Sequence, residues 1–160
     1  MQKILQRTSI VLFMAVSVFL VAFGLLYANV GDLLWFHAAA VPADALEKVR
    51  PLYFALMKLI GGASIGLGLL GAYVILVPMR QGVKGAAIVV AIAYWIAFVV
   101  AGYTAVRLNE LTGAPVAWYN MAILTVLTGL GLLAHVFAVR QGHHAPAQTI
   151  SGSMRGLSST

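Results

Sequence analysis

The sequence contains no cysteine and very few charged side chains. Without cysteine the chain cannot form a disulfide, a thiolate metal site, a Cys-x-x-Cys redox pair or a covalent attachment to a c-type haem. Charged residues make up 9% of the chain and only four residues are acidic, whereas a typical soluble domain carries about 25% charged residues. No Gly-rich phosphate loop or Ser-His-Asp arrangement can be read from so few polar groups. The sequence therefore predicts no metal site, no cofactor and no catalysis of the kind that soluble enzymes perform.

Hydrophobic residues, in contrast, make up 62% of the chain. Four apolar runs are each long enough for a helix that crosses the roughly 30 Å hydrocarbon layer of a bilayer. The first run exceeds the apolar core of about 7 to 15 residues of a signal peptide, so we expect an uncleaved helix. The sequence predicts an all-α, polytopic membrane protein in which residues 1–140 form one transmembrane domain. The four spans are expected at about residues 8–30, 52–77, 85–106 and 116–139.

The linkers and charges predict the topology. Residues 78–84 and 107–115 are short linkers, so consecutive helices are expected to be antiparallel neighbours in an up-down-up-down bundle. One side of this bundle then carries the whole net charge of +6, and its basic residues are Lys3, Arg7, Arg80, Lys84, Arg140 and Arg155. Excess Lys and Arg in short loops mark the cytoplasmic side. Both termini are therefore predicted to be cytoplasmic, with the protein in the plasma membrane, which in a bacterium is the inner membrane.

The remaining segments predict a surface helix and a tail. Residues 42–49, in the longer linker between the first two spans, are compatible with a short helix on the surface. Residues 141–160 are rich in Ser, Gly and His and are predicted to form a disordered cytoplasmic tail. The basic side suits anionic membrane lipids, to which each Lys or Arg contributes about 1 kcal/mol near the surface. The expected partners are therefore membrane lipids and a second copy or another membrane subunit, and no nucleic acid is needed to explain the charge.

Small residues in the second span predict a close helix contact. Gly62 and Gly66 form a G-x-x-x-G motif, and Ser64 and Gly68 repeat the spacing of four on a neighbouring stripe. Small residues at this spacing let two helix backbones approach closely, which matters because lipid provides no hydrophobic drive for helices to associate. The contact is made either with other helices of the same chain or with a second copy.

Lys58 is the one charge inside a predicted span. Its ammonium group either extends along the helix to the lipid headgroups or turns inward toward a polar cluster at the outer ends of the spans. Arg107 and Glu110 stand one turn apart and are expected to pair. Convergence of a few polar groups in an apolar cleft is typical of ligand sites. The residues of this candidate ligand-binding site are Lys58, Tyr103, Arg107, Glu110 and Asn120.

Other polar side chains inside the spans need partners. Tyr94 and Trp95 lie near the middle of the third span and are expected either to form internal hydrogen bonds in the core or to line a site for a flat, lipid-soluble ligand. His135 lies near the cytoplasmic end of the fourth span, whereas His37 lies in the outer linker. Because a bis-His haem needs two histidines at the same depth, we expect His135 to be hydrogen-bonded or interfacial instead.

The four-span pattern, the Gly-rich segment of residues 59–66 and Arg107 followed by Gly113-Ala114-Pro115 resemble the DoxX-like families of small four-helix bacterial membrane proteins. The resemblance implies the four-helix fold, and DoxX itself is associated with a quinone-reducing membrane subunit. No motif in this sequence carries a catalytic residue over from those families.

Three functions are compatible with this sequence. The first prediction is an integral membrane accessory subunit or scaffold without catalysis of its own. A small transporter or channel is the alternative, against which stands the scarcity of ionisable groups inside the spans. The third is a membrane oxidoreductase subunit or a protein that binds a lipid or quinone.

Overall fold

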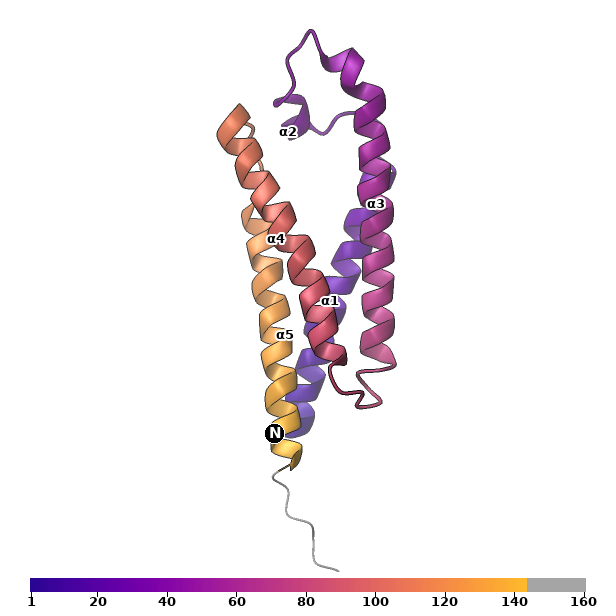
Figure 1. Cartoon of the computed structure of the whole chain (residues 1–160), viewed down its shortest axis with the longest axis vertical. Coiled ribbons are helices and arrows are strands. Elements are labelled where there is room, and N and C mark those ends of the chain that lie inside the picture. Colours follow the sequence, from indigo (N-terminus) through magenta and orange to yellow (C-terminus); the bar gives the residue numbers. More distant parts are fainter. Residues whose placement is uncertain (144–160) are drawn as a thin grey trace, which may run out of the picture.

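The computed structural model describes residues 1–143, and these form four long helices and one short one (Figure 1). The long helices alternate in direction along the bundle, and each is long and apolar enough to cross a membrane. The predicted all-α class and the four long, apolar helices are confirmed. The helices are α1 (Gln2–Ala28), α2 (Trp35–Ala38), α3 (Leu46–Leu76), α4 (Ala86–Thr112) and α5 (Tyr119–His143). We call the two ends of the bundle the N-terminal end and the α2 end.

The helix limits differ from the predicted ones. The helix α3 begins at Leu46, so Pro51 lies inside it rather than before it, and the separate surface helix expected at residues 42–49 is absent from the described chain. The helix α5 continues to His143, so the first residues of the predicted tail are helical; residues 144–160 of that tail lie outside the described part. The helix α4 ends at Thr112 and is capped by Gly113, whose φ of 69° suits a residue without a Cβ atom.

The helices α3 and α4 are joined by a short turn but hardly touch, although the sequence predicts that they are neighbours. Instead α1 packs against both α3 and α5, and α4 packs against α5. The helices α1 and α5 are thus in extensive contact with each other, while α3 packs on α1 and α4 packs on α5. We call α1 with α3 and α4 with α5 the two helix pairs. Figure 1 shows that α4 meets α3 near the N-terminal end and that the two separate toward the α2 end.

Glycines allow α1 and α3 to touch through their backbones. A Cβ atom on Gly24 would lie 2.6 Å from the carbonyl oxygen of Gly61, and one on Gly61 would lie 2.6 Å from the backbone nitrogen of Ala28. One on Gly68 would lie 2.8 Å from the carbonyl oxygen of Ser17. No side chain fits at these positions without moving a helix. Dispersion between closely approaching backbones is a main source of helix association in lipid.

The predicted G-x-x-x-G motif lies on a different face of α3. A Cβ atom on Gly62 or Gly66 would meet nothing within 4 Å, and Ser64 is only half-buried. Of the four small residues singled out in the sequence, only Gly68 makes the close contact with α1. The prediction that Gly62 and Gly66 pack within the chain is therefore wrong. Their packing against a second copy stays a prediction.

The two helix pairs are joined by a buried hydrogen bond at Tyr94 of α4. The Tyr94 hydroxyl lies 2.6 Å from Ser17 Oγ on α1, and Ser17 Oγ donates to the Phe13 carbonyl at 3.0 Å. Since Ser17 has one hydroxyl hydrogen, Tyr94 donates to Ser17. The Tyr94 ring is fully buried and its hydroxyl occupies the space that a Cβ atom on Gly71 of α3 would need. Three helices therefore meet at this side chain.

Gly61 and Gly62 provide a matched test of the α1–α3 contact. Gly61→Ala should lower the free energy of unfolding by about 1 to 3 kcal/mol, because the added methyl group overlaps the α1 backbone. Gly62→Ala should not destabilise the protein, since its Cβ atom meets open space. Unfolding in a mild detergent titrated with SDS measures both. Equal effects of the two substitutions would show that α1 does not pack on the Gly61 face.

Ser17 and Tyr94 should differ in the cost of their removal. Ser17→Ala leaves a buried phenol hydroxyl without a partner, which costs about 1 to 3 kcal/mol, whereas Tyr94→Phe removes one hydrogen bond and leaves Ser17 bonded to Phe13, which costs about 0.5 to 1.5 kcal/mol. The same SDS titration compares them. If Tyr94→Phe is the more damaging of the two, the proposed direction of donation is wrong.

Candidate functional site

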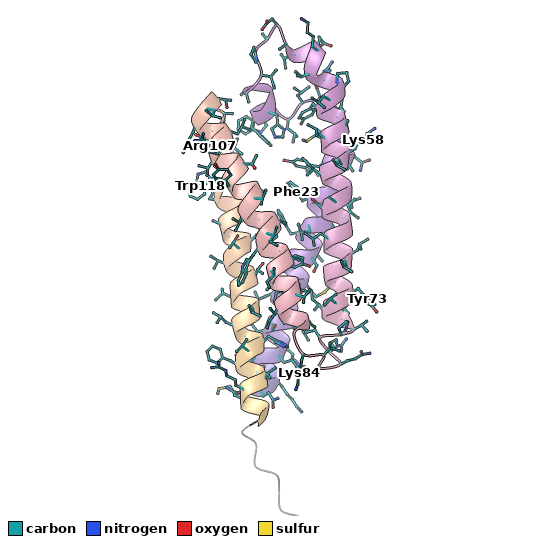
Figure 2. The ribbon with its side chains drawn as sticks, viewed as in Figure 1. Phe23, Lys58, Tyr73, Lys84, Arg107 and Trp118 are labelled. Atoms are coloured by element: carbon teal, nitrogen blue, oxygen red, sulfur yellow. The ribbon has the colours of Figure 1, made fainter. Side chains whose placement is uncertain are left out.

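The residues of the predicted polar site do not converge. Arg107 Nη1 and Glu110 Oε2 form the expected ion pair at 2.6 Å, but Lys58 points away from the bundle on the far side of α3 (Figure 2). Tyr103 is 67% exposed, and Asn120 is exposed as well. The structure therefore brings together only Arg107 and Glu110.

The direction of Lys58 follows from the face of α3 on which it lies. Lys58, Gly62 and Gly66 are spaced by four residues and so share one helix face. That face is open, because the glycines have nothing beside them and α1 packs on the Gly61 face instead. The separation of α4 from α3 removes the neighbour that Lys58 would need to reach Glu110.

A different group of polar side chains meets at the α2 end. The Tyr53 hydroxyl of α3 accepts a hydrogen bond from the Leu34 N–H at 3.1 Å and lies 3.1 Å from His37 Nδ1 of α2. The phenol hydrogen is then available for Nδ1, and in the tautomer that accepts it the proton of the neutral imidazole lies on Nε2. None of the hydrogen bonds found in residues 1–143 uses Nε2, so in this tautomer His37 has one spare donor.

Aromatic rings extend from this histidine along α1. Successive ring centroids lie 5.9, 4.1, 6.5 and 5.4 Å apart. We call this set the aromatic row: Phe19, Phe23, Tyr27, His37 and Tyr53. Phe19 is 36% exposed and the other four side chains are half-buried, so no helix of the described chain covers the row completely. Figure 2 places Phe23 in the region where the two helix pairs separate.

Ion pairs hold the linker that carries α2. Arg50 Nη2 lies 2.6 Å from Asp32 Oδ1, and Arg50 Nη1 lies 3.5 Å from Glu47 Oε1. The hydrogen bond from Arg50, followed by that from the Leu33 N–H, lowers the pKa of the Asp32 carboxyl below its usual value. Because Asp32 is largely exposed, the pair adds little stability. Its main effect is to orient the linker that carries His37.

The two aromatic residues near the middle of α4 have internal partners. Tyr94 bonds to Ser17, and Trp95 Nε1 donates to the Thr125 carbonyl of α5 at 3.0 Å. The first of the two predicted roles, core packing with an internal hydrogen bond, is confirmed.

The sequence predicts that His135 is hydrogen-bonded or interfacial. Its Nδ1 is buried without a partner in the described part of the chain, so no hydrogen bond is found at this nitrogen. His135 lies in the second half of α5, toward the N-terminal end of the bundle, whereas His37 lies in α2 at the opposite end. Their different depths agree with the prediction that they do not share a haem. Residues 1–143 contain no group of three or more His, Asp or Glu side chains placed to hold a metal ion.

One part of the aromatic row was visible in the sequence and one was not. Phe19, Phe23 and Tyr27 follow the helical spacing of four residues, which would have shown that they share a face. The pairing of His37 with Tyr53 depends on how residues 29–45 fold back over the bundle. No periodic pattern in that linker predicts this path.

The docking of α2 should depend on pH. Burial lowers the pKa of His37 below its ordinary value of 6.5. The undocked linker therefore takes up a proton more readily, and docking loses stability as the pH falls below about 6.5. Hydrogen exchange of residues 31–45, corrected for its intrinsic pH dependence, should be slow at pH 7.5 and faster at pH 5.5. In His37→Gln this difference should disappear; if it persists, another group controls the linker.

Comparisons with family models, with curated proteins and with solved structures found no match for this chain. The resemblance to the DoxX-like families therefore stays a prediction, and functional arguments depend on the geometry of the site.

Proposed function

We propose that the protein crosses the plasma membrane, which in a bacterium is the inner membrane, four times, with both termini in the cytoplasm. The charges of the two ends support this orientation. The acidic residues Asp32, Asp44, Glu47 and Glu110 all lie toward the α2 end, and the N-terminal end carries basic residues only. The α2 end then faces outward.

The length of α3 explains how Lys58 is tolerated. A helix of 31 residues is about 46 Å long, which exceeds a hydrocarbon layer of about 30 Å. If the cytoplasmic boundary of the hydrocarbon layer lies near Leu76, about 20 residues of α3 cross the layer. The outer boundary then lies near Leu56. Lys58 then lies within about one turn of the headgroups, which its side chain can reach.

We infer that the outer half of the protein binds a lipid-soluble amphiphile with a planar head, such as a quinone. The observation that carries this function is the aromatic row, which is incompletely covered and ends at the spare Nε2–H donor of His37. A hydrogen-bond acceptor on the planar head suits His37. An apolar tail suits Phe23 and Phe19, which lie progressively deeper along α1.

The position of Phe23 in the region where the two helix pairs separate (Figure 2) favours this function over a purely structural role. Aromatic walls with a small number of placed polar groups are typical of small-molecule sites. No step of catalysis follows from these residues, and the proposed role is binding.

A scaffold role remains the second candidate, and the open face of α3 is the observation that favours it. Gly62 and Gly66 leave a shallow strip on a face that no other helix of the described chain covers. A second copy or another membrane subunit has room to pack there. Crosslinking between cysteines introduced at Gly62 in two copies distinguishes this role from the binding of a small amphiphile.

Ligand binding is tested with the purified full chain and a short-chain benzoquinone. Titration should quench tryptophan fluorescence in a saturable way. Phe23→Ala should weaken binding about tenfold, since an aromatic contact contributes about 0.5 to 1.5 kcal/mol beyond the area that it buries. Phe137→Ala is the matched control, because Phe137 is 51% exposed on α5 and lies outside the aromatic row. Equal losses in the two variants, or no saturable binding, would contradict the proposed function.

The orientation is tested with reporter fusions at Arg80, Asn109 and the C-terminus. Arg80 and the C-terminus should report the cytoplasm, because loops rich in basic residues are retained on the cytoplasmic side. Asn109 should report the opposite side. The reverse pattern would place the aromatic row in the cytoplasmic leaflet.

A further inference from the structure

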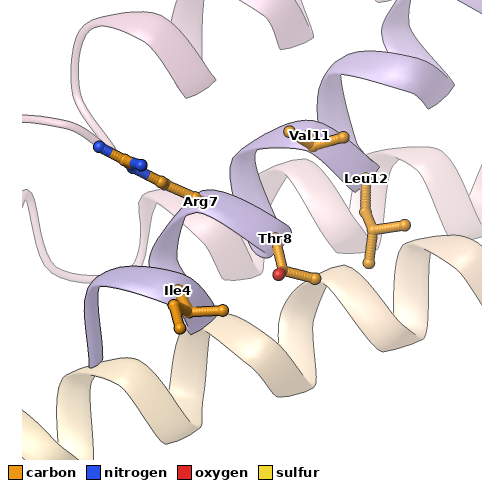
Figure 3. Close-up of a pocket in the computed structure, with 5 residues that line it drawn as sticks. All are labelled: Ile4, Arg7, Thr8, Val11 and Leu12. Carbon is orange, nitrogen blue, oxygen red and sulfur yellow. The ribbon is translucent and has the colours of Figure 1, made fainter. Parts of the chain in front are cut away.

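A groove on α1 near the N-terminal end combines one cation with apolar side chains. It has a volume of about 410 Å³ and is lined by Ile4, Arg7, Thr8, Val11 and Leu12 (Figure 3). Ile4, Thr8 and Leu12 follow one another along one side of the helix, and Arg7 extends away from the helix axis. The groove lies at the opposite end of the bundle from the aromatic row.

Arg7 has no acidic partner that the chain could supply at this end. The sequence contains only four acidic residues, and all of them lie toward the α2 end. The basic side chains of Lys3, Arg80, Lys84 and Arg140 lie at the same end as Arg7 and add to its positive charge. A counterion for this end must therefore come from outside the protein.

Thr8 has a free hydroxyl group. Other helical threonines, such as Thr104 and Thr128, donate to the carbonyl four residues earlier in the chain, at 2.9 and 2.8 Å. No hydrogen bond of the Thr8 hydroxyl is found within residues 1–143. A guanidinium group and an unused hydroxyl therefore line the same groove, one residue apart. Both are donors that suit the oxygens of a phosphate group.

The depth of these donors suits a phospholipid. The segment from Thr8 to Ala28 spans about 31 Å of helix, which matches the hydrocarbon thickness of a bilayer. Arg7 then lies at the level of the phosphate groups. Val11, which is 64% exposed, and Leu12 lie one turn deeper, at the level of the acyl chains.

We propose that this groove binds one anionic phospholipid. Arg7 contacts the phosphate through two guanidinium N–H groups, and Thr8 donates a hydrogen bond to the same phosphate. The first part of an acyl chain lies against Val11 and Leu12. The positive charge of this end selects anionic over zwitterionic lipids. This site is independent of the proposed binding of a quinone-like molecule, and either is testable without the other.

Native mass spectrometry of the full chain in detergent, with added phosphatidylglycerol or phosphatidylcholine, tests the site. We expect one phosphatidylglycerol to bind more tightly than the others and more tightly than phosphatidylcholine. Arg7→Gln should weaken this first binding event about fivefold, the factor that one basic residue contributes near a membrane. Thr8→Val, which keeps the shape of the side chain, should weaken it about twofold or more, because a hydrogen bond is lost.

Arg140→Gln is the matched control, because Arg140 lies at the same end and does not line the groove. It should weaken the first binding event clearly less than Arg7→Gln does, because it removes only long-range attraction. Inorganic phosphate should not displace the lipid, since phosphate has no acyl chain. Equal losses in Arg140→Gln and Arg7→Gln would show diffuse attraction to a charged surface and overturn the site. An unchanged affinity in Thr8→Val, or displacement by inorganic phosphate, would also overturn it.

Discussion

The hydrogen bond between Tyr94 and Ser17 is the interaction on which the arrangement of the bundle depends. It joins α4 to α1 in a fully buried position, and the absence of a side chain at Gly71 of α3 makes room for the phenol hydroxyl. Lipid cannot satisfy a buried hydroxyl group, so this polar contact has few alternative arrangements. This hydrogen bond adds to the packing of α1 against α5, which joins the two helix pairs.

The separation of the pairs has consequences for the α2 end. Phe23 on the outer part of α1 lies in the region where the two pairs separate (Figure 2), and it is only half-buried. The linker that carries α2 closes the top of this region, because Tyr53 holds both the Leu34 backbone and His37. The linker therefore places His37 at the end of the aromatic rings of α1.

The two ends of the protein differ in whether their basic residues have acidic partners. At the α2 end, Asp32 and Glu47 neutralise Arg50, and Glu110 neutralises Arg107. At the N-terminal end the basic residues have no acidic partners in the chain, so their counterions are expected from the membrane surface. This difference in charge underlies our proposals of a neutral, lipid-soluble ligand at one end and an anionic phospholipid at the other.

The sequence by itself determined the all-α class and the number of spans, because these follow from the length of apolar runs and from the need to satisfy every backbone group within a helix. It also predicted the Arg107–Glu110 pair, whose spacing is local, and internal partners for Tyr94 and Trp95. Only the tertiary structure decided which face of α3 packs against α1, that Lys58 points outward and that α3 and α4 separate. Lipid is as apolar as the inside of the bundle, so hydropathy does not distinguish a face that packs from a face that meets lipid. Gly61 and Gly62 are the same residue in the same helix, and only the position of α1 makes them different.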